Sequence, residues 1–166
     1  MTYIIFKIKL SFYLFILISY LAPMLSTSSK YAIKAVLWLA LHSDYENKIK
    51  VKDIGKPINV PPAYLAKLLQ ALARQGVISS TKGPKGGFYL SEANRNLPLI
   101  NVIEVIDGGA RITSCLLGFE NCNAQKPCPL HALVAASRQE LVEKLETRTI
   151  DSLSTELEKG QSFLPL

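Results

Sequence analysis

Cysteine is scarce in this chain of 166 residues: Cys115, Cys122 and Cys128 all lie within 14 consecutive residues. An odd and clustered set is a poor disulfide framework, which argues against a small secreted protein held together by cross-links. The chain also has no internal repeat and no low-complexity linker, so a repeat array is excluded. The clustered thiols instead favour a metal or cluster site in a reducing compartment.

Signatures of catalysis are missing as well. Neither a glycine-flanked nucleophile nor a cofactor-binding glycine motif occurs in the chain. Cys115 and His131 have the chemistry of a nucleophile and a base, but the sequence offers no third group to orient them. We therefore expect no enzymatic activity and no small-molecule substrate.

The first 23 residues contain no acidic residue, and residues 4–22 are mostly apolar. Such a segment fits a signal peptide, or a membrane anchor of marginal length. The favoured interpretation is a native start at Met24, with residues 1–23 mis-assigned or dispensable, because export does not suit reduced thiols. We therefore expect a cytoplasmic protein without a membrane partner.

The composition allows a packed core and a polyanionic partner. Hydrophobic residues make up 49% of the chain, the net charge is +6 and the isoelectric point is about 9.2. Subtracting Lys7 and Lys9 from the total still leaves +4. This basic character suits nucleic acid, although a soluble protein of another kind can carry it too.

Hydrophobic spacing predicts three helices followed by a hairpin. A first helix is expected over residues 28–42, a short second one over 51–56, and a third that begins after Pro61 and Pro62 and ends at Gly76. The apolar residues of the third helix recur at helical spacing: Leu65, Leu68, Leu69 and Leu72. Two strand-like runs, 77–81 and 88–90, flank a glycine-rich turn.

This order is typical of a winged helix-turn-helix, so the fold class is mainly α with a small β-hairpin wing and a long C-terminal dimerisation helix. The DNA-binding region is expected over residues 24–95, and a region of cysteine loop and dimerisation helices over 96–159. The second region is expected to contain a helix over 99–107, a loop over 110–129, a long helix over 131–148 and a short helix capped by Thr149. Residues 160–166 are expected to form a loose tail.

Two surfaces of the first region are candidates for DNA contact. The start of the third helix would face base edges in the major groove, and the wing turn would approach phosphates. The candidate residues are Pro62, Ala63, Tyr64, Lys67, Lys82, Gly83, Lys85 and Gly86. The plain alternative is that the lysines are merely solvated and that the glycines only make a tight turn.

The cysteines form the pattern Cys115-x6-Cys122-x5-Cys128, with His131 three residues further on. Thiolates bind both iron–sulfur clusters and zinc, and three thiolates with one imidazole suit a 2Fe–2S cluster or a structural zinc. Gaps of six and five residues are longer than the two to four of compact zinc motifs, which favours the cluster. A metal-free thiol switch, with His131 an ordinary helix-start residue, stays open as an alternative.

The chain from residue 24 to about 157 resembles the Rrf-type winged-helix regulators, a family that includes regulators of iron–sulfur cluster assembly and repressors that sense nitric oxide. Four motifs carry the resemblance: STSSKYAIKAVLWLA, PPAYLAKLLQALARQGVISSTKGPKGGFYLS, INVIEVIDG and CPLH. The resemblance implies a homodimer joined through the helix at 131–148 and a double-stranded, pseudo-palindromic operator. It also implies a cluster on Cys115, Cys122 and Cys128, with His131 as fourth ligand.

The sequence departs from the family pattern at two points. The first cysteine gap is one residue longer than the commonest family spacing, which leaves the loop geometry open. Some members take a carboxylate ligand from the start of the partner's first helix, but residues 25–41 contain no Asp or Glu. The resulting hypothesis is a transcription regulator whose operator binding responds to an iron–sulfur cluster, 2Fe–2S rather than 4Fe–4S, that senses cluster status, nitric oxide or redox stress. The alternative is a winged-helix protein with a structural zinc or a thiol switch.

Overall fold

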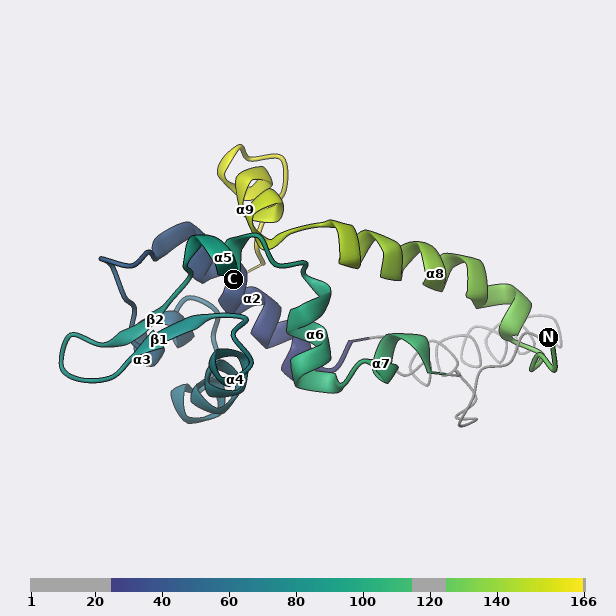
Figure 1. The fold of residues 1–166 in the computed structure, drawn as a ribbon, viewed down its shortest axis with the longest axis horizontal. Helices are drawn as coiled ribbons and strands as arrows, with labels where there is room; N and C mark the ends of the chain where they lie inside the picture. Colours follow the sequence, from purple (N-terminus) through teal and green to yellow (C-terminus); the bar gives the residue numbers. More distant parts are fainter. Residues whose placement is uncertain (1–24, 115–124, 166) are drawn as a thin grey trace, which may run out of the picture.

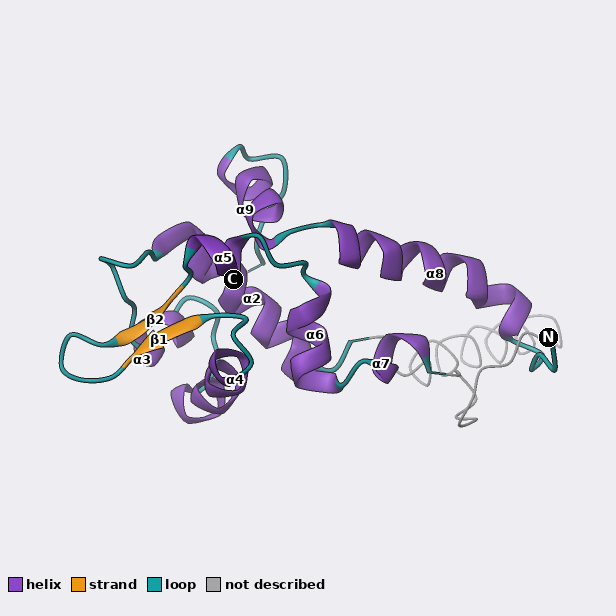
Figure 2. Cartoon of the chain, in the orientation of Figure 1, coloured by secondary structure: helices purple, strands orange, loops and turns teal. Residues whose placement is uncertain are grey.

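The computed structural model describes residues 25–114 and 125–165, and shows a mainly helical molecule with one two-stranded sheet at one end (Figures 1 and 2). The N-terminal part runs α2 (Thr27–His42), α3 (Val51–Gly55), α4 (Pro62–Arg74), β1 (Ser79–Thr81), β2 (Gly87–Tyr89) and α5 (Glu92–Arg95). The remainder runs α6 (Ile100–Asp107), α7 (Ala110–Thr113), α8 (His131–Thr147) and α9 (Ile150–Glu158). Among the described residues, no helix is long and apolar enough to cross a membrane.

Helix α2 lies at the centre of the molecule and contacts α3, α4, α6 and α9. It begins one residue before the predicted start, and the Ser26 side chain caps it by accepting a hydrogen bond from the Ser29 backbone N–H at 3.0 Å. The buried face carries apolar residues at helical spacing: Ala32, Ala35, Val36, Leu39 and Ala40. Trp38 packs against this core and contacts the ring of His42, so it serves as a packing residue.

Helix α4 has a proline in its first turn, where the missing N–H leaves no hydrogen bond unmade. Leu65, Leu68, Leu69 and Leu72 are all buried, which confirms the predicted core face. The exposed face carries polar side chains one and two turns apart: Lys67, Gln70 and Arg74. The helix therefore presents one continuous polar stripe to solvent.

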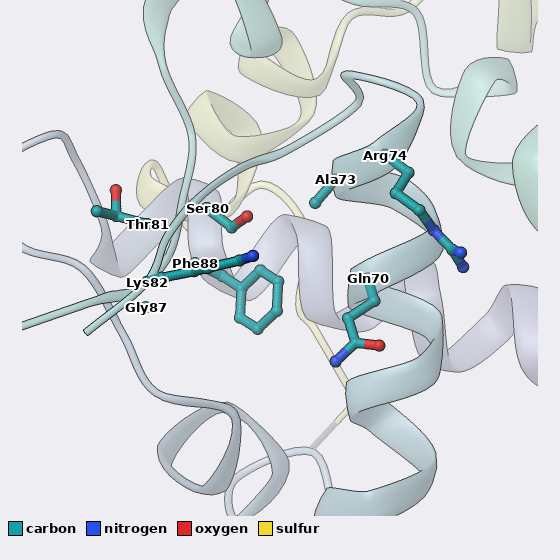
Figure 3. A pocket seen from close by; sticks show the side chains of 8 residues that line it. All are labelled: Gln70, Ala73, Arg74, Ser80, Thr81, Lys82, Gly87 and Phe88. Atoms are coloured by element: carbon teal, nitrogen blue, oxygen red, sulfur yellow. The ribbon is translucent and has the colours of Figure 1, made fainter. Parts of the chain in front are cut away.

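The hairpin is antiparallel, with Ser79 opposite Tyr89 and Thr81 opposite Gly87, and it lies beside the C-terminal half of α4 (Figure 3). Phe88 exchanges two backbone hydrogen bonds with Ile49 at 2.8 and 2.9 Å, which fixes the hairpin to the segment before α3. A Cβ on Gly87 would lie 2.7 Å from the Ile49 carbonyl oxygen, so this close backbone approach requires glycine. Strand β1 is shorter than the predicted 77–81, since Val77 and Ile78 serve as buried core residues before it, and β2 begins and ends one residue before the predicted 88–90.

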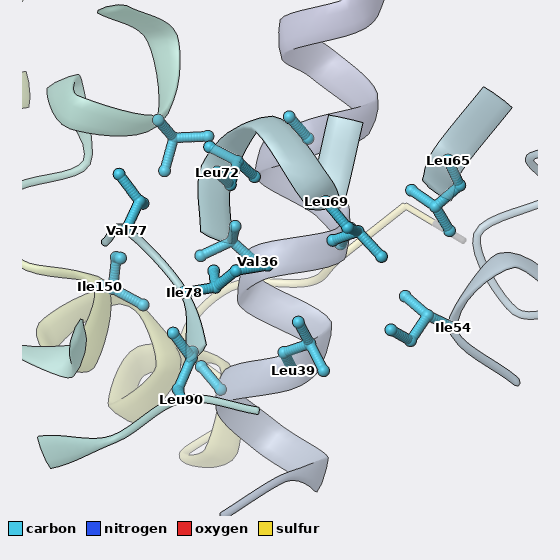
Figure 4. Close-up of a cluster of buried hydrophobic side chains, with 14 of the residues drawn as sticks. Val36, Leu39, Ile54, Leu65, Leu69, Leu72, Val77, Ile78, Leu90 and Ile150 are labelled. Atoms are coloured by element: carbon cyan, nitrogen blue, oxygen red, sulfur yellow. The ribbon is translucent and has the colours of Figure 1, made fainter. Parts of the chain in front are cut away.

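One hydrophobic cluster joins both halves of the described chain (Figure 4). It combines Val36 and Leu39 of α2, the buried leucines of α4, Leu90 after the wing and Ile150 of α9. Two backbone hydrogen bonds hold the start of α9 in place, from Leu99 N–H to the Arg148 carbonyl and from Ile150 N–H to the Leu97 carbonyl. The predicted winged helix-turn-helix with a long C-terminal helix is confirmed.

Two short helices were not predicted. Helix α5 is held by a capping box, in which Ser91 and Asn94 bond each other's backbone N–H groups. Helix α7 lies in the stretch 110–129 that was expected to be loop, so that prediction was wrong for Ala110–Thr113. Each helix has four residues, too few to show a hydrophobic period.

Helix α8 extends away from the body of the molecule (Figure 1). It has 17 residues, and none of them is buried. Leu133 is 74% exposed, and the other large apolar residues named here, Val134, Leu141 and Leu145, are only partly buried. The side of the helix that carries Leu133 therefore has no packing partner within the described part of the chain.

Candidate nucleic-acid interface and metal centre

Positive charge collects on α4 and the hairpin. Between Asp53 and Glu92 the chain contains five basic residues and no acidic residue, so most of the net charge of +6 arises here. All five are exposed: Lys56, Lys67, Arg74, Lys82 and Lys85. A surface of this kind attracts a polyanion and has no carboxylate of its own to repel one.

The four candidate residues at the start of α4, Pro62, Ala63, Tyr64 and Lys67, are all exposed. The Tyr64 hydroxyl is 2.7 Å from the hydroxyl of Ser28, and its ring meets the edge of the Tyr31 ring with centroids 6.2 Å apart. The start of α4 is therefore tied to the start of α2. Sequence reasoning missed Ser28, because only the fold brings these two helix starts together.

In the wing turn, Lys82, Gly83 and Lys85 are exposed and Gly86 is buried. A Cβ on Gly86 would lie 2.1 Å from the Thr81 carbonyl oxygen, so the tight turn alone is enough to require glycine there. Lys82 and Lys85 are free of any salt bridge among the described residues. The wing therefore offers two lysines that an anion can reach.

The predicted metal site lies only partly within the structure. Cys115 and Cys122 are outside the described residues. Cys128 and His131 are both partly buried, and the His131 backbone N–H donates to the Cys128 carbonyl at 2.9 Å. One turn of chain at the start of α8 thus carries a thiol and an imidazole. The described residues alone contain no group of three or more His, Cys, Asp or Glu side chains arranged for a metal.

Asp107, the last residue of α6, joins the start of α2 to the segment that leads into the cysteines. Its carboxylate accepts hydrogen bonds from the Ser26 backbone N–H at 3.0 Å and from the Ser26 hydroxyl at 2.5 Å. Burial raises the pKa of Asp107, but these bonds, with smaller effects of Ser29 and Arg111, bring that pKa below its ordinary 3.8. We attribute the lowering mainly to Ser26, because the buried Ser29 hydroxyl has no partner at full hydrogen-bond distance among the described residues.

Replacing Asp107 by asparagine is expected to lower the free energy of unfolding by about 2 kcal/mol at neutral pH, since hydrogen bonds to a charged acceptor are lost. A carboxylate with a lowered folded pKa stabilises the protein above its unfolded pKa of 3.8, and this stability is lost as the pH falls through the folded pKa. The free energies of unfolding of the two proteins, measured in urea, should therefore differ at neutral pH, and the difference should narrow below pH 3.8.

The exposed Glu158→Gln on α9 serves as the charge-matched control and should leave unfolding unchanged. The role assigned to the Asp107 charge would be contradicted if the difference in free energy of unfolding between Asp107→Asn and the original chain stayed the same in strong acid.

Comparison with known families and proteins agrees with this geometry. The model of the Rrf2 family, described as iron-dependent transcriptional regulators, matches residues 25–156. The transcriptional regulator IscR of Xenorhabdus nematophila is 33% identical over 141 residues, which cover 84% of this chain and 82% of that protein. IscR of Pectobacterium carotovorum is 30% identical over 129 residues, or 78% and 77% of the two chains.

Solved structures show the same fold. CymR, the global cysteine regulator of Bacillus subtilis, superposes with a TM-score of 0.64 at 22% identity, over 79% of this chain and 95% of that one. IscR of T. potens superposes with a TM-score of 0.62 at 21% identity, over 83% and 90%. The curated relatives are regulators and not enzymes, as the sequence predicts. With its three-helix core, its basic wing and this match over most of its length, the chain belongs to the Rrf2 family of DNA-binding transcriptional regulators.

Proposed function

We propose that this regulator controls its operator through an iron–sulfur cluster of the 2Fe–2S type, held by Cys115, Cys122, Cys128 and His131, and that it acts in the cytoplasm. The observation that carries the proposal is the position of Cys128 and His131 on the turn that opens α8. This turn connects the cysteine segment directly to a long helix whose far end is bonded to the winged-helix core.

The donor chemistry fits such a group. Thiolates with one imidazole suit iron in a cluster, and His131 is partly buried where α8 begins. When bound, a cluster supplies a centre that gains or loses electrons and is destroyed by oxidants or nitric oxide. Zinc would satisfy the same four ligands without this sensitivity, and it is the alternative that metal analysis separates.

We further propose that the active form is a homodimer joined through α8. The Leu133 side of this helix is unpartnered among the described residues, and a second copy related by two-fold symmetry would supply the same surface to cover it. Two copies of α4 would then meet successive major grooves about 34 Å apart on a pseudo-palindromic operator. Dimer geometry would thus set the spacing of the half-sites.

The residues of the chain connect the two functions through α8. The helix begins at His131, three residues after Cys128, and its last residues precede Arg148, whose carbonyl is bonded to Leu99 of the core. Ligand binding at the first end can change operator affinity only if two arrangements of the dimer hold the ligand with different affinities. We place that difference in the orientation of α8 relative to the winged-helix core.

Purification without oxygen tests the proposal directly. The expected product is a coloured protein with visible absorbance and with iron and sulfide in a fixed ratio to the chain. Its affinity for a duplex that it selects from a random-sequence pool should change once the colour is bleached by nitric oxide. A colourless protein with one zinc per chain would contradict the cluster, and an oxidised metal-free protein that still switches on DNA would favour the thiol mechanism.

A further inference from the structure

A cleft separates α4 from the hairpin. It has a volume of about 420 Å³ and is open to solvent. Its lining comes from three elements: Gln70, Ala73 and Arg74 of α4, Ser80, Thr81 and Lys82 on the β1 side, and Gly87 and Phe88 of β2. In Figure 3, the Lys82 side chain runs across Phe88 toward α4, and Gln70 extends from α4 on the opposite side.

The geometry points to this cleft as the seat of one phosphate of the DNA backbone, with Gln70, Ser80 and Lys82 as its ligands. The inference deepens the DNA-binding function and rests on it. With α4 in the major groove and the wing turn over the neighbouring minor groove, one sugar–phosphate strand has to pass between them, because that strand is the wall between the grooves. The cleft is the space between those two elements.

The chemistry of the lining suits a phosphodiester. Lys82 brings a positive charge, while the Gln70 amide and the Ser80 hydroxyl can donate hydrogen bonds, and all three residues are exposed. The lining contains no carboxylate, and none occurs between Asp53 and Glu92. The C-terminal end of a helix disfavours an anion, but Arg74 in the last turn of α4 offsets that effect.

The side of the cleft formed by Phe88 has a fixed position as well. Phe88 is partly buried, and its backbone is bonded to Ile49. The hairpin is thereby fixed to the segment before α3, and the cleft beside α4 is present in the chain without DNA. A seat formed in advance costs little ordering on binding and fixes the register of α4 along the groove.

The test uses the full chain and a duplex that it selects from a random-sequence pool. Single methylphosphonate groups, which lack the negative charge, replace each phosphate in turn, and dissociation constants are measured by fluorescence anisotropy. For the original protein, we expect one phosphate beside the major-groove contacts whose neutralisation weakens binding about tenfold. The same replacement should cost less in Gln70→Ala and in Lys82→Gln than in the original protein, and less than about twofold in the double variant, in which both partners are absent.

Two matched controls lie outside the cleft: Gln75→Ala, just past the end of α4, and Lys85→Gln, at the wing turn. Both should retain the full tenfold penalty at that phosphate. If neutralising that phosphate weakened binding equally in Gln70→Ala and in the original protein, the proposed phosphate site would be refuted while DNA binding stayed intact. Failure of the original protein to select any duplex would overturn the DNA-binding function, and the seat with it.

Discussion

Replacing Cys128 by alanine is expected to remove the bound cluster entirely and to change operator affinity by about tenfold or more, a range typical of coupling between two sites. Cys128 is the proposed cysteine ligand nearest to α8, since its carbonyl accepts a hydrogen bond from the backbone N–H of His131, the first residue of that helix. Loss of its thiolate leaves two thiolates and one imidazole, a set that falls short of the four ligands that a 2Fe–2S cluster takes.

Iron and sulfide assays after anaerobic purification measure the first effect, and anisotropy on the selected duplex measures the second. The exposed Ser137→Ala on α8 is the control and should retain full cluster content. A Cys128→Ala protein with its full complement of iron and sulfide would refute the ligand assignment. A protein that lost the cluster but bound every duplex unchanged would refute cluster-dependent control.

Replacing Leu133 by glutamate is expected to weaken the dimer about 100-fold or more, because two-fold symmetry places the unpaired charge in the interface twice. The fold of the monomer should be spared, since Leu133 is 74% exposed within the described chain. Affinity for a palindromic duplex should fall with dimerisation, because two linked half-site contacts bind far more tightly than one.

Sedimentation over a range of protein concentrations gives the dimer dissociation constant. Gln139→Glu adds the same charge to another side of α8, where the side chain is also exposed, and should leave the dimer intact. An unchanged molecular mass for Leu133→Glu at micromolar concentration would remove this side of α8 from the interface.

The sequence was sufficient to predict the elements that have a long hydrophobic period or that are bounded by glycine or proline. The stripe of α2, the leucines of α4 and the glycines that end elements gave bounds within two residues of those observed. The hairpin followed from its turn, where backbone contacts require glycine at Gly86 and Gly87 and a positive φ favours it at Gly83. Helices α5 and α7 were not predicted, because four residues are too few to show a hydrophobic period. Helix α5 depends on a cap between Ser91 and Asn94.

The candidate DNA-contact residues show the same division. Lys67 and Lys82 were apparent from motif order, because Lys67 lies near the start of the predicted third helix and Lys82 flanks the predicted wing turn. Gln70 and Ser80 were not, since the cleft arises only when α4 and the hairpin pack side by side. The bond between Ser26 and Asp107 spans 81 positions, a separation that local patterns do not report.

Helix α8 is bonded to the core through the backbone beyond its C-terminal end and is contacted by α6 and α7, which gives it the mechanics of a lever. With 17 residues it is about 26 Å long at 1.5 Å per residue, and the backbone bonds of Leu99 and Ile150 form its fulcrum. A displacement of about 2 Å at the cysteine end would arrive at the fulcrum as a rotation of only about 4°. In the proposed cluster-binding dimer, such a rotation would tilt the two α4 helices relative to each other.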